Sequence, residues 1–356
     1  MTSVIASKIA PKSATSTTVP VEPIVSMPKF EPFTNLQDSN HLANVTIIGS
    51  GAWGSALATL AKQNNHQVHM WSRRNSESIE EAVSGADIIV SAVSMKGVAP
   101  TIAKLKAIGL PVSTIIVTAT KGLDPDTTQT PSQMWQEGFP SLPVVVLSGP
   151  NLSKEIEKGL PAATVVASTH LEAAEATQVV FASDVLRVYV NPDPIGTELG
   201  GTLKNVMAIA AGVCDGLNLG TNARSALLTR ALPEMIRMGT QLGAQPETFV
   251  GLAGLGDLLA TCSSPLSRNY RVGFGLSQGR ALEHILEELK STAEGVNTAN
   301  VLMELARREK IPMPIARQVY RLLHGKITPE EAVQALMDRE LKQEFEDELL
   351  QANDDV

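Results

Sequence analysis

A single lysine stands inside a stretch that is otherwise typical of a buried helix, GTELGGTLKNVMAIAAG. Lys204 is the only charged residue between Glu198 and Asp215. Its neighbours one helical turn to either side, Gly200 and Ala208, cannot pair with an ammonium group. One interpretation is a lysine that lays its stem along the surface and keeps its charge in water. The other is a partly desolvated lysine, whose lowered pKa lets it donate or accept a proton.

A glycine-rich turn near the start of the chain is suited to bind phosphate. The sequence NVTIIGSGAWGSALATLAKQNNHQVHMW predicts a strand at 45–48, a helix at 55–63 and a strand at 67–71. The first turn has the G-x-G-x-x-G spacing, carried by Gly49, Gly51 and Gly54. Between a strand and a helix, these glycines let the turn close tightly and bring the helix N-terminus against a pyrophosphate. The pattern therefore predicts a dinucleotide site.

Two arginines follow the second of these strands, where a dinucleotide site reads the ribose. An NAD-specific site has Asp or Glu there, bonded to the 2′-hydroxyl, whereas this chain has Ser72, Arg73 and Arg74. Two guanidinium groups suit a 2′-phosphate, so the sequence favours NADP(H). The alternative interpretation is a turn with two solvated arginines.

The apolar runs predict the elements that hold these residues. ADIIVSAVS, STIIVTATKG and PVVVLSGPNL are typical of strands covered on both faces, AATVVAST and LRVYVN add further strands, and VAPTIAKLKAI and LEAAEATQVVFA are helical. The alternation predicts a Rossmann-type doubly wound α/β sheet over 43–191, followed by an all-α domain over 192–342. The default site is the cleft between them. Lys121 and the SGPN segment at 148–151 follow strands, at the edge where such sheets bind ligands.

Nine motifs occur together in one order: GSGAWGSALA, TATKGL, LSGPN, GGTLKNVMAIAAG, TNARSALLTRALPEM, GLAGLGDLLATC, SPLSRNYRVG, EGVNTA and IPMPI. This arrangement resembles the NAD(P)-dependent sn-glycerol-3-phosphate dehydrogenases of the bacterial type, over roughly residues 44–340. The resemblance implies the reversible reduction of dihydroxyacetone phosphate to sn-glycerol 3-phosphate, the backbone of phospholipids. The resemblance allows both coenzymes, and Arg73 and Arg74 make NADP(H) the expected preference, with NAD(H) also possible.

The resemblance also implies a role for each matching residue. Lys204, in GGTLKNV, matches the catalytic lysine, and Lys121, in ATKG, matches a lysine that touches both substrate and coenzyme. The other implied substrate contacts are Gly149, Asn151, Asp257, Ser267, Arg268 and Asn269. The coenzyme contacts that it implies are Trp53, Arg73, Lys121, Ser153, Arg268 and Glu294. The glycine-rich turn and the end of the second strand add Gly49, Ser50, Gly51, Ala52, Gly54 and Arg74 to the expected coenzyme site.

Two features depart from the family pattern. Asn151 stands where the family has Ser or Thr after Gly-Pro, so its contact with the substrate does not follow from the match. Only NSESIEEAVSG joins the second strand to ADIIV, where the family has a longer segment. The first domain is therefore expected to lack a strand or lobe at one edge.

The chemistry of a ketone reduction agrees with these roles. Hydride must reach the carbonyl carbon, and a lysine ammonium beside the carbonyl stabilises the developing alkoxide and supplies its proton. Ser267, Arg268 and Asn269 offer a hydroxyl, a guanidinium and an amide to a phosphate. The alternative interpretation is that the serine of this segment caps a helix. Phosphate binding and helix capping can occur together, because helix N-termini bind phosphate. Asp257 either orients a lysine or bonds a substrate hydroxyl, and the sequence leaves both open.

Composition argues against other partners. The 356 residues carry a formal net charge of −8, which disfavours nucleic acid and anionic membranes. No apolar run reaches membrane-spanning length, and the six histidines and two cysteines lack the spacing of metal ligands. We therefore expect neither stable membrane insertion nor a metal. The expected location is cytoplasmic, and a homodimer is left open as the assembly.

The two ends differ in composition from the rest. Residues 1–42 are rich in Ser, Thr, Pro and Val, and predict a disordered or targeting tail. An organellar transit peptide is the alternative, although this stretch lacks the arginines of such peptides. Residues 343–356 predict an acidic, solvated tail.

Two other functions compete with this interpretation. One is a dehydrogenase of the wider superfamily that acts on a β-hydroxyacid or a sugar acid phosphate, which a substrate panel separates. The other is a nucleotide sensor that binds NADP(H) without turnover. The presence of both Lys121 and Lys204 favours catalysis over sensing.

Overall fold

A computed structural model describes residues 42–289, 293–341 and 344. All of them belong to one unit of contacts, 32–356. Within it, the described residues up to 191 form a sheet with helices, and those after it form helices alone. This confirms the predicted Rossmann-type α/β part and the all-α part that follows it. The tails predicted at the two ends fall almost entirely outside the described residues.

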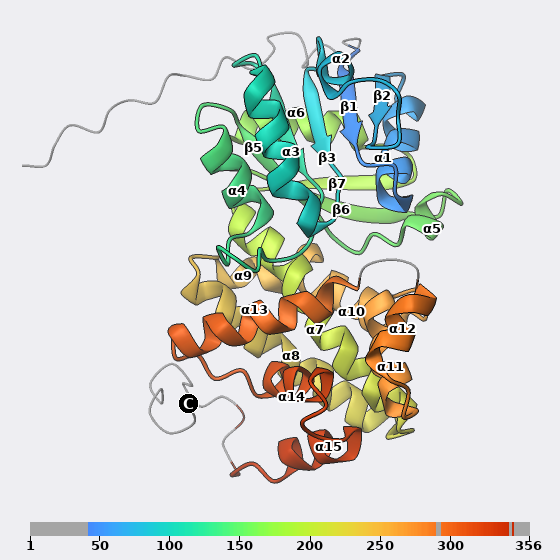
Figure 1. The fold of residues 1–356 in the computed structure, drawn as a ribbon, viewed down its shortest axis with the longest axis vertical. Helices are drawn as coiled ribbons and strands as arrows, with labels where there is room; N and C mark the ends of the chain where they lie inside the picture. The colour runs from blue at the N-terminus through green and yellow to red at the C-terminus, as the bar shows by residue number, and fades with distance from the viewer. Residues whose placement is uncertain (1–41, 290–292, 342–343, 345–356) are drawn as a thin grey trace, which may run out of the picture. The chain divides into compact units, whose positions relative to one another are not determined.

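The sheet has seven strands in the order β2-β1-β3-β4-β5-β6-β7 (Figure 1). They are β1 (Asn44–Ile48), β2 (Gln67–Trp71), β3 (Ile88–Ser91), β4 (Ile115–Thr118), β5 (Val144–Ser148), β6 (Ala162–Ala167) and β7 (Leu186–Asn191). Every residue of β3, β4 and β5 is buried, which explains their unbroken apolar sequences.

Helices cover both faces of this sheet. They are α1 (Ala52–Gln63), α2 (Ile79–Val83), α3 (Met95–Ile108), α4 (Pro131–Gly138), α5 (Ser153–Ile156) and α6 (Leu171–Phe181). Ile48, Ile89 and Ile116 share a core cluster with α2, α3 and α4. Successive residues of a strand face opposite sides of the sheet. Ile47, which follows Thr46 and precedes Ile48 on β1, therefore faces the other layer, where α1 packs against α5 and α6.

One strand of the sheet runs against the others. β6 pairs antiparallel with β5, whereas every other neighbouring pair is parallel. A parallel return needs a crossover, usually a full helix, but the β5–β6 connection contains only the four-residue α5. The chain therefore turns back on itself after the SGPN segment.

The short segment after β2 contains a helix and no strand. NSESIEEAVSG forms α2, whose capping box is closed by Ser78 and Glu81. Among the described residues, β2 is consequently an edge strand of the sheet. Helix α4 was missed by the sequence interpretation, although Thr130, Pro131 and Gln133 spell a capping box with proline at the first turn.

The second half is a helical bundle around α7 (Pro194–Gly216) (Figure 1). The further helices are α8 (Gly220–Gln241), α9 (Pro246–Val250), the π-helix η1 (Leu252–Gly256), α10 (Asp257–Ser263), α11 (Arg268–Ser277), α12 (Leu282–Leu289), α13 (Glu294–Arg308), α14 (Pro314–Leu323) and α15 (Pro329–Met337). Glycines let neighbours approach α7 closely. A Cβ on Gly200 would lie 2.6 Å from the carbonyl oxygen of Ala253, and one on Gly212 would overlap Tyr270.

Within the described ranges, no helix combines the length and the apolarity needed to cross a membrane. Among the same residues, His, Cys, Asp and Glu side chains nowhere gather in threes as metal ligands.

Candidate active site

Helix α7 holds Lys204 in a buried position. The residue is 6% exposed, although it carries a charge. Its Nζ donates hydrogen bonds to Asp257 Oδ1 at 2.5 Å and to Thr261 Oγ1 at 2.5 Å. The interpretation of Lys204 as a surface lysine is therefore wrong, and that of a desolvated lysine is confirmed.

Lys121 reaches the same carboxylate from the sheet. It follows β4, and its Nζ donates to Asp257 Oδ2 at 2.6 Å and to the carbonyl oxygen of Gly149 at 3.2 Å. Because β4 and β5 are neighbours, their carboxyl ends bring Lys121 and Gly149 together. Asp257 itself is 1% exposed and lies between two ammonium groups.

The electrostatics of this cluster favour proton transfer at Lys204. Burial lowers the pKa of the Lys204 ammonium from its ordinary 10.5 to about 8. The carboxylate of Asp257 opposes this shift, and the positive charge of Lys121 adds to it. A group with a pKa near 8 exchanges its proton readily near neutral pH.

The backbone places Asp257 at the start of a helix. It follows the π-helical turn η1 directly and is the first residue of α10, where the helix dipole stabilises a carboxylate. π-helical turns occur frequently at functional sites. Thr261 lies one turn later on the same face of α10, which brings its hydroxyl to Lys204. Asp257 thus holds both lysines. Of the two roles that the sequence left open for it, the structure shows the orientation of a lysine.

The SGPN segment lies against β6. A Cβ on Gly149 would come within 3.0 Å of Thr164 Cα, so the close approach requires glycine. Asn151 Oδ1 accepts a hydrogen bond from Thr164 Oγ1 at 2.9 Å, and its Nδ2 donates to the Ala163 carbonyl at 3.3 Å. The amide of Asn151 therefore ties the segment to β6, and its substrate contact stays a prediction.

The SRN segment begins α11 and is joined to α7, the helix that carries Lys204. Ser267 caps α11 by accepting from the Tyr270 N–H at 3.2 Å, which confirms the helix-cap interpretation. Asn269 is buried; its Nδ2 donates to Asn205 Oδ1 at 2.9 Å and its Oδ1 accepts from the Gly295 N–H at 3.0 Å. Asn205 is the residue after Lys204, so Asn269 links the SRN segment to α7.

Arg268 differs from its two neighbours. Its side chain is exposed and forms no hydrogen bond with the residues that the structure describes. It lies near Glu294, the first residue of α13, whose carboxyl accepts a hydrogen bond from the backbone N–H of Met95. Burial raises the pKa of Glu294, and the Met95 bond and the charge of Arg268 oppose this. Glu294 thus joins α13 to the N-terminus of α3.

The glycine-rich turn has the space and the donors that a pyrophosphate needs. A Cβ on Gly49 would collide with the carbonyl group of Ala92, and one on Gly54 would collide with the carbonyl oxygen of Gly49. A Cβ on Gly51 would meet nothing within 4 Å. Gly51 is the N-cap of α1, no side chain caps that helix, and no acidic residue lies in its first turn. The free N–H groups of the first turn therefore fit a dinucleotide phosphate. Ser50, Gly51 and Ala52 are exposed there, and Trp53 is partly buried.

Arg73 and Arg74 follow a strand that ends beside the glycine-rich turn. The N–H of Gly49 donates to the carbonyl oxygen of Trp71 at 2.8 Å, so the end of β2 lies next to the glycines. Arg73 and Arg74 follow in a turn and are both exposed. Ser153 begins α5, which packs against α1, the helix of the glycine motif.

Sequence reasoning missed two threonines that position the cluster. Thr261 bonds Lys204, and its spacing of four residues from Asp257 on one helix was the available signal. Thr202 Oγ1 accepts from the Gly122 N–H at 3.1 Å and so fixes α7 beside the Lys121 loop. Only the packing of the helix on the loop identifies this contact. Cys262, the residue after Thr261, is fully buried, and burial raises the pKa of its thiol to about 12.

Comparison with known proteins identifies the family of this chain. Residues 44–81 and 74–174 match the N-terminal domain of NAD-dependent glycerol-3-phosphate dehydrogenase, and residues 193–334 match its C-terminal domain. A glycerol-3-phosphate dehydrogenase (NAD(P)+) of Synechocystis sp. is 67% identical over 303 residues, which cover 85% of this chain and 96% of that protein. The enzyme of the same name from Acaryochloris marina is 65% identical over 300 residues, 84% of this chain and 97% of that one.

Solved structures agree with this match. Glycerol-3-phosphate dehydrogenase from Coxiella burnetii superposes with a TM-score of 0.80 at 32% identity, over 84% of this chain and 99% of that one. The described fold, the family models and these relatives point the same way: the chain belongs to the NAD-dependent glycerol-3-phosphate dehydrogenase family.

Proposed function

We propose that this protein reduces dihydroxyacetone phosphate to sn-glycerol 3-phosphate, with Lys204 as the proton donor. The reaction is reversible, uses NAD(P)H and supplies the glycerophospholipid backbone. The observation that supports the assignment is the buried cluster in which one carboxylate, Asp257, holds the ammonium groups of Lys204 and Lys121. In such a cluster, the ammonium groups supply a transferable proton and a positive electrostatic potential at the same place.

Lys204 delivers the proton that the reduced carbonyl oxygen requires. As hydride reaches the carbonyl carbon, negative charge develops on the oxygen, and a nearby ammonium stabilises that charge and then transfers its proton. A pKa of about 8 leaves Lys204 mostly protonated at neutral pH, which suits reduction. In the reverse direction, the neutral amine takes the proton from the 2-hydroxyl group.

Asp257 and Lys121 set the position and charge of Lys204. The two oxygens of Asp257 each bond one lysine, so the carboxylate fixes the separation between the two ammonium groups. Thr261 fixes a second direction at Lys204 Nζ. Lys121 is more exposed than Lys204, which supports the proposal that it touches both substrate and coenzyme.

The phosphate of the substrate is assigned to the SRN segment. Arg268 is exposed and not engaged by another described side chain in a hydrogen bond, so its guanidinium is available to an anion. It begins α11, where the helix dipole adds to the attraction. Asn269 has one amide hydrogen left after its bonds to Asn205 and Gly295, while the Ser267 oxygen is used as a helix cap.

The coenzyme is assigned to the first domain. Gly49, Gly51 and Gly54 with the first turn of α1 hold the pyrophosphate, and Arg73 and Arg74 hold a 2′-phosphate, which gives NADP(H) the preference over NAD(H). The bound dihydronicotinamide supplies the hydride. Ser153 and Glu294 complete the proposed coenzyme contacts from α5 and α13.

A spectrophotometric assay of NADPH oxidation tests the assignment. We expect turnover with dihydroxyacetone phosphate and at least a tenfold lower kcat/KM with unphosphorylated dihydroxyacetone, because the phosphate contributes charge-assisted bonds. Asp257→Asn should lower kcat, since the neutral amide no longer fixes two ammonium groups, while Asp126→Asn on an exposed turn serves as the matched control. Turnover of a β-keto acid in preference to dihydroxyacetone phosphate would reject the proposal.

A cytoplasmic location and a homodimer are proposed on the sequence alone. Cell fractionation and sedimentation velocity test them, and an organellar fraction would favour the transit-peptide alternative.

A further inference from the structure

Arg224, in the TNARSALLTRALPEM motif, lies outside the proposed site, yet it joins three helices of the second half. It stands in the second turn of α8, and its Nη1 donates to Asp215 Oδ2 on α7 at 3.1 Å. Its Nη2 donates to the carbonyl oxygen of Cys262 on α10 at 3.0 Å. The last four carbonyls of a helix lack partners within it, so the guanidinium caps the end of α10. The planar fork of an arginine suits two such contacts at once.

Asp215 gives Arg224 a firm anchor. Its Oδ2 also accepts from the Tyr270 hydroxyl on α11 at 2.8 Å. Helix α11 packs closely on α7 there, since a Cβ on Gly212 would overlap the carbonyl oxygen of Tyr270. Asp215 lies in the last turn of α7, where the helix dipole disfavours a carboxylate, and the cation of Arg224 offsets this. Arg224 is thus attached to a closely packed junction of α7 and α11.

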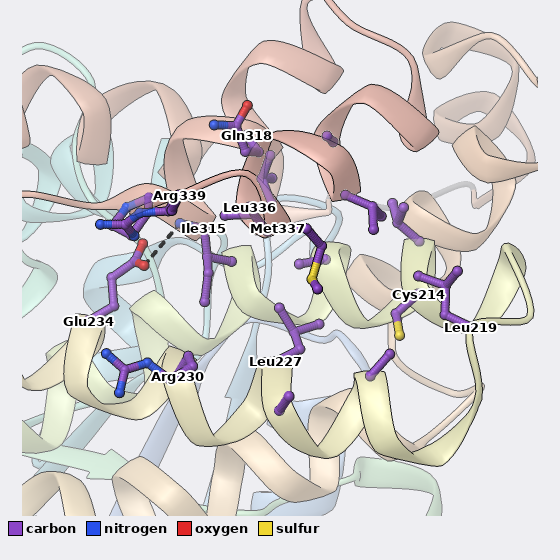
Figure 2. Close-up of a pocket in the computed structure, with 18 of the residues that line it drawn as sticks. Cys214, Leu219, Leu227, Arg230, Glu234, Ile315, Gln318, Leu336, Met337 and Arg339 are labelled. Carbon is purple, nitrogen blue, oxygen red and sulfur yellow. Dashed lines mark hydrogen bonds between the residues drawn. The ribbon is translucent and has the colours of Figure 1, made fainter. Parts of the chain in front are cut away.

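The packing of α7 against α8 is incomplete beside this pair. A pocket of about 430 Å³ lies among α7, α8, α14 and α15, with Cys214 and Leu219 at one end (Figure 2). Cys214 precedes Asp215 on α7, and Leu219 is the N-cap of α8. Apolar contacts between the two helices are interrupted there, so the ion pair of Arg224 with Asp215 connects them where the packing is open.

The far end of α10 has few directional contacts of its own. The helix has seven residues and follows the glycine-rich π-helical turn η1. Residues 263–266 after it are mostly exposed, and Ser264 accepts from the N–H groups of Leu266 and Ser267 within the same turn. Apolar packing is not directional, so it holds α10 against its neighbours without fixing its rotation. The bond from Arg224 supplies a direction at this end.

This end of α10 carries a proposed site contact. Cys262 immediately follows Thr261, whose hydroxyl oxygen lies 2.5 Å from Lys204 Nζ and 3.3 Å from Asp257 Oδ1. A shift of the last turn of α10 therefore changes the contact between Thr261 and Lys204 directly. Misplacement of a reacting group by about 1 Å can cost up to about a hundredfold in rate.

We propose that Arg224 is a positioning residue for the reduction: it holds the last turn of α10 against α7 and thereby keeps the Thr261 hydroxyl on the Lys204 amine. The inference rests on the proposed function, since it makes Arg224 act through Lys204. The SRN segment keeps its own bonds to α7 and α13 through Asn269. Loss of Arg224 should therefore impair proton transfer and leave phosphate binding largely intact.

Steady-state NADPH oxidation separates positioning from binding. We expect Arg224→Ala to lower kcat about tenfold and to change KM for dihydroxyacetone phosphate by less than about twofold, because only the chemical step depends on the Lys204 geometry. Arg224→Lys should recover part of the loss, since an ammonium reaches one of the two partners but lacks the fork. Arg280→Ala, which breaks an exposed ion pair with Glu288, is the matched control. A wild-type kcat in Arg224→Ala, or a change in KM alone, would overturn the proposal.

A double-mutant cycle tests the route through Thr261. Thr261→Val removes the hydroxyl and keeps the shape of the side chain. In that background, Arg224→Ala should lower kcat by less than about twofold, since the contact that Arg224 maintains is already absent. A loss of about tenfold in both backgrounds would mean that Arg224 acts elsewhere in the protein, which contradicts the proposal.

Amide hydrogen exchange tests the contact without turnover. We expect Arg224→Ala to speed exchange about tenfold in residues 258–266 and to leave residues 268–277 of α11 unchanged, because only the end of α10 loses a tie. Arg280→Ala should change neither segment. If Arg224→Ala does not fold, Arg224→Lys serves for both measurements.

The two measurements distinguish failure of this inference from failure of the proposed function. Unchanged exchange at the end of α10 would overturn the inference even in a protein that reduces dihydroxyacetone phosphate. Faster exchange in a wild-type background that does not reduce dihydroxyacetone phosphate would reject the proposed function, and with it the part of Arg224 in the reduction.

Discussion

At the scale of single residues, the chemistry is concentrated where charges are buried. Lys204 keeps its charge in a buried position because Asp257 lies 2.5 Å away, and the balance of burial and pairing sets its pKa near 8. Asp257 is a stronger determinant of this site than any surface charge, since buried pairs are poorly screened. The lysine that the sequence alone left ambiguous is therefore the residue whose replacement is most informative.

Lys204→Ala should lower kcat by about two to four orders of magnitude, the range of acid–base and electrostatic contributions, with coenzyme affinity little changed. In the wild type, reduction needs the protonated amine, so its kcat should fall as pH rises through about 8, and oxidation should increase over the same range. Steady-state kinetics in both directions measure this. Retention of more than a tenth of wild-type kcat would exclude Lys204 from the chemistry.

Replacing Arg73 and Arg74 by Ser should weaken the binding of NADPH about tenfold to a hundredfold and leave the binding of NADH nearly unchanged. An exposed charge-assisted contact to a 2′-phosphate adds about one to three kcal/mol, which gives this factor. KM for each coenzyme at low ionic strength measures it, and Arg187→Ser, on β7, is the control. An equal loss of both coenzymes would show that the arginines do not read the 2′-phosphate.

At the scale of elements, α7 belongs to both halves of the protein. Its Lys204 bonds Asp257 in the proposed active site, and its Glu198 is bonded to the N-terminus of α4 beside the sheet. The two carboxylate oxygens of Glu198 accept from the Ser132 N–H at 3.0 and 3.1 Å, and a further bond joins Glu198 to the Ser132 hydroxyl. The same helix therefore carries the lysine that we propose as the proton donor and the contact that holds α4.

Glu198 should make the protein less stable at alkaline pH. Burial raises its pKa from 4.5 to about 7, and the bonds from Ser132 and Thr130 oppose this. Because the folded pKa is above the unfolded one, its contribution is full below about 4.5 and is lost as pH rises through 7. The loss is about 3 kcal/mol, and most of it occurs between roughly pH 4.5 and 7.

Glu198→Gln should therefore flatten the dependence of the unfolding free energy on pH over this range. Denaturant titrations at several pH values measure it, with Glu80→Gln on the exposed face of α2 as the control. Burial also raises the pKa of Glu234 to about 7. The variant should therefore keep part of the pH dependence of its unfolding free energy. Identical pH profiles for Glu198→Gln and the wild type would contradict the prediction.

At the scale of the whole molecule, the described residues from 42 onwards include both regions that match the family. A variant that begins at His41 should accordingly fold and turn over at the wild-type rate. Circular dichroism melting and the NADPH assay measure this at matched protein concentration. A fall in Tm of more than about 5 °C would mean that the removed residues pack on the body.

Local sequence patterns were enough to predict most strands and helices of the sheet domain and to propose its coenzyme-binding turn. The strand at 67–71 and the strand at 186–191 appear with the predicted bounds, because their apolar runs are bordered by polar turns. The glycine spacing could be interpreted locally, since a strand, a tight turn and a helix N-terminus are all contained in about ten residues. The antiparallel β6 was not foreseen, because its direction depends on a four-residue helix in the connection.

The meeting of Lys204, Lys121 and Asp257 could be learned only from the folded chain. Asp257 is 53 residues from Lys204 and 136 from Lys121, and no local pattern reports a contact across such separations. The same holds for the pKa of Lys204, which depends on burial by η1 and α10 packed against α7. A sequence specifies which groups can ionise, whereas desolvation and pairing, which set their pKa values, arise only when distant segments pack together.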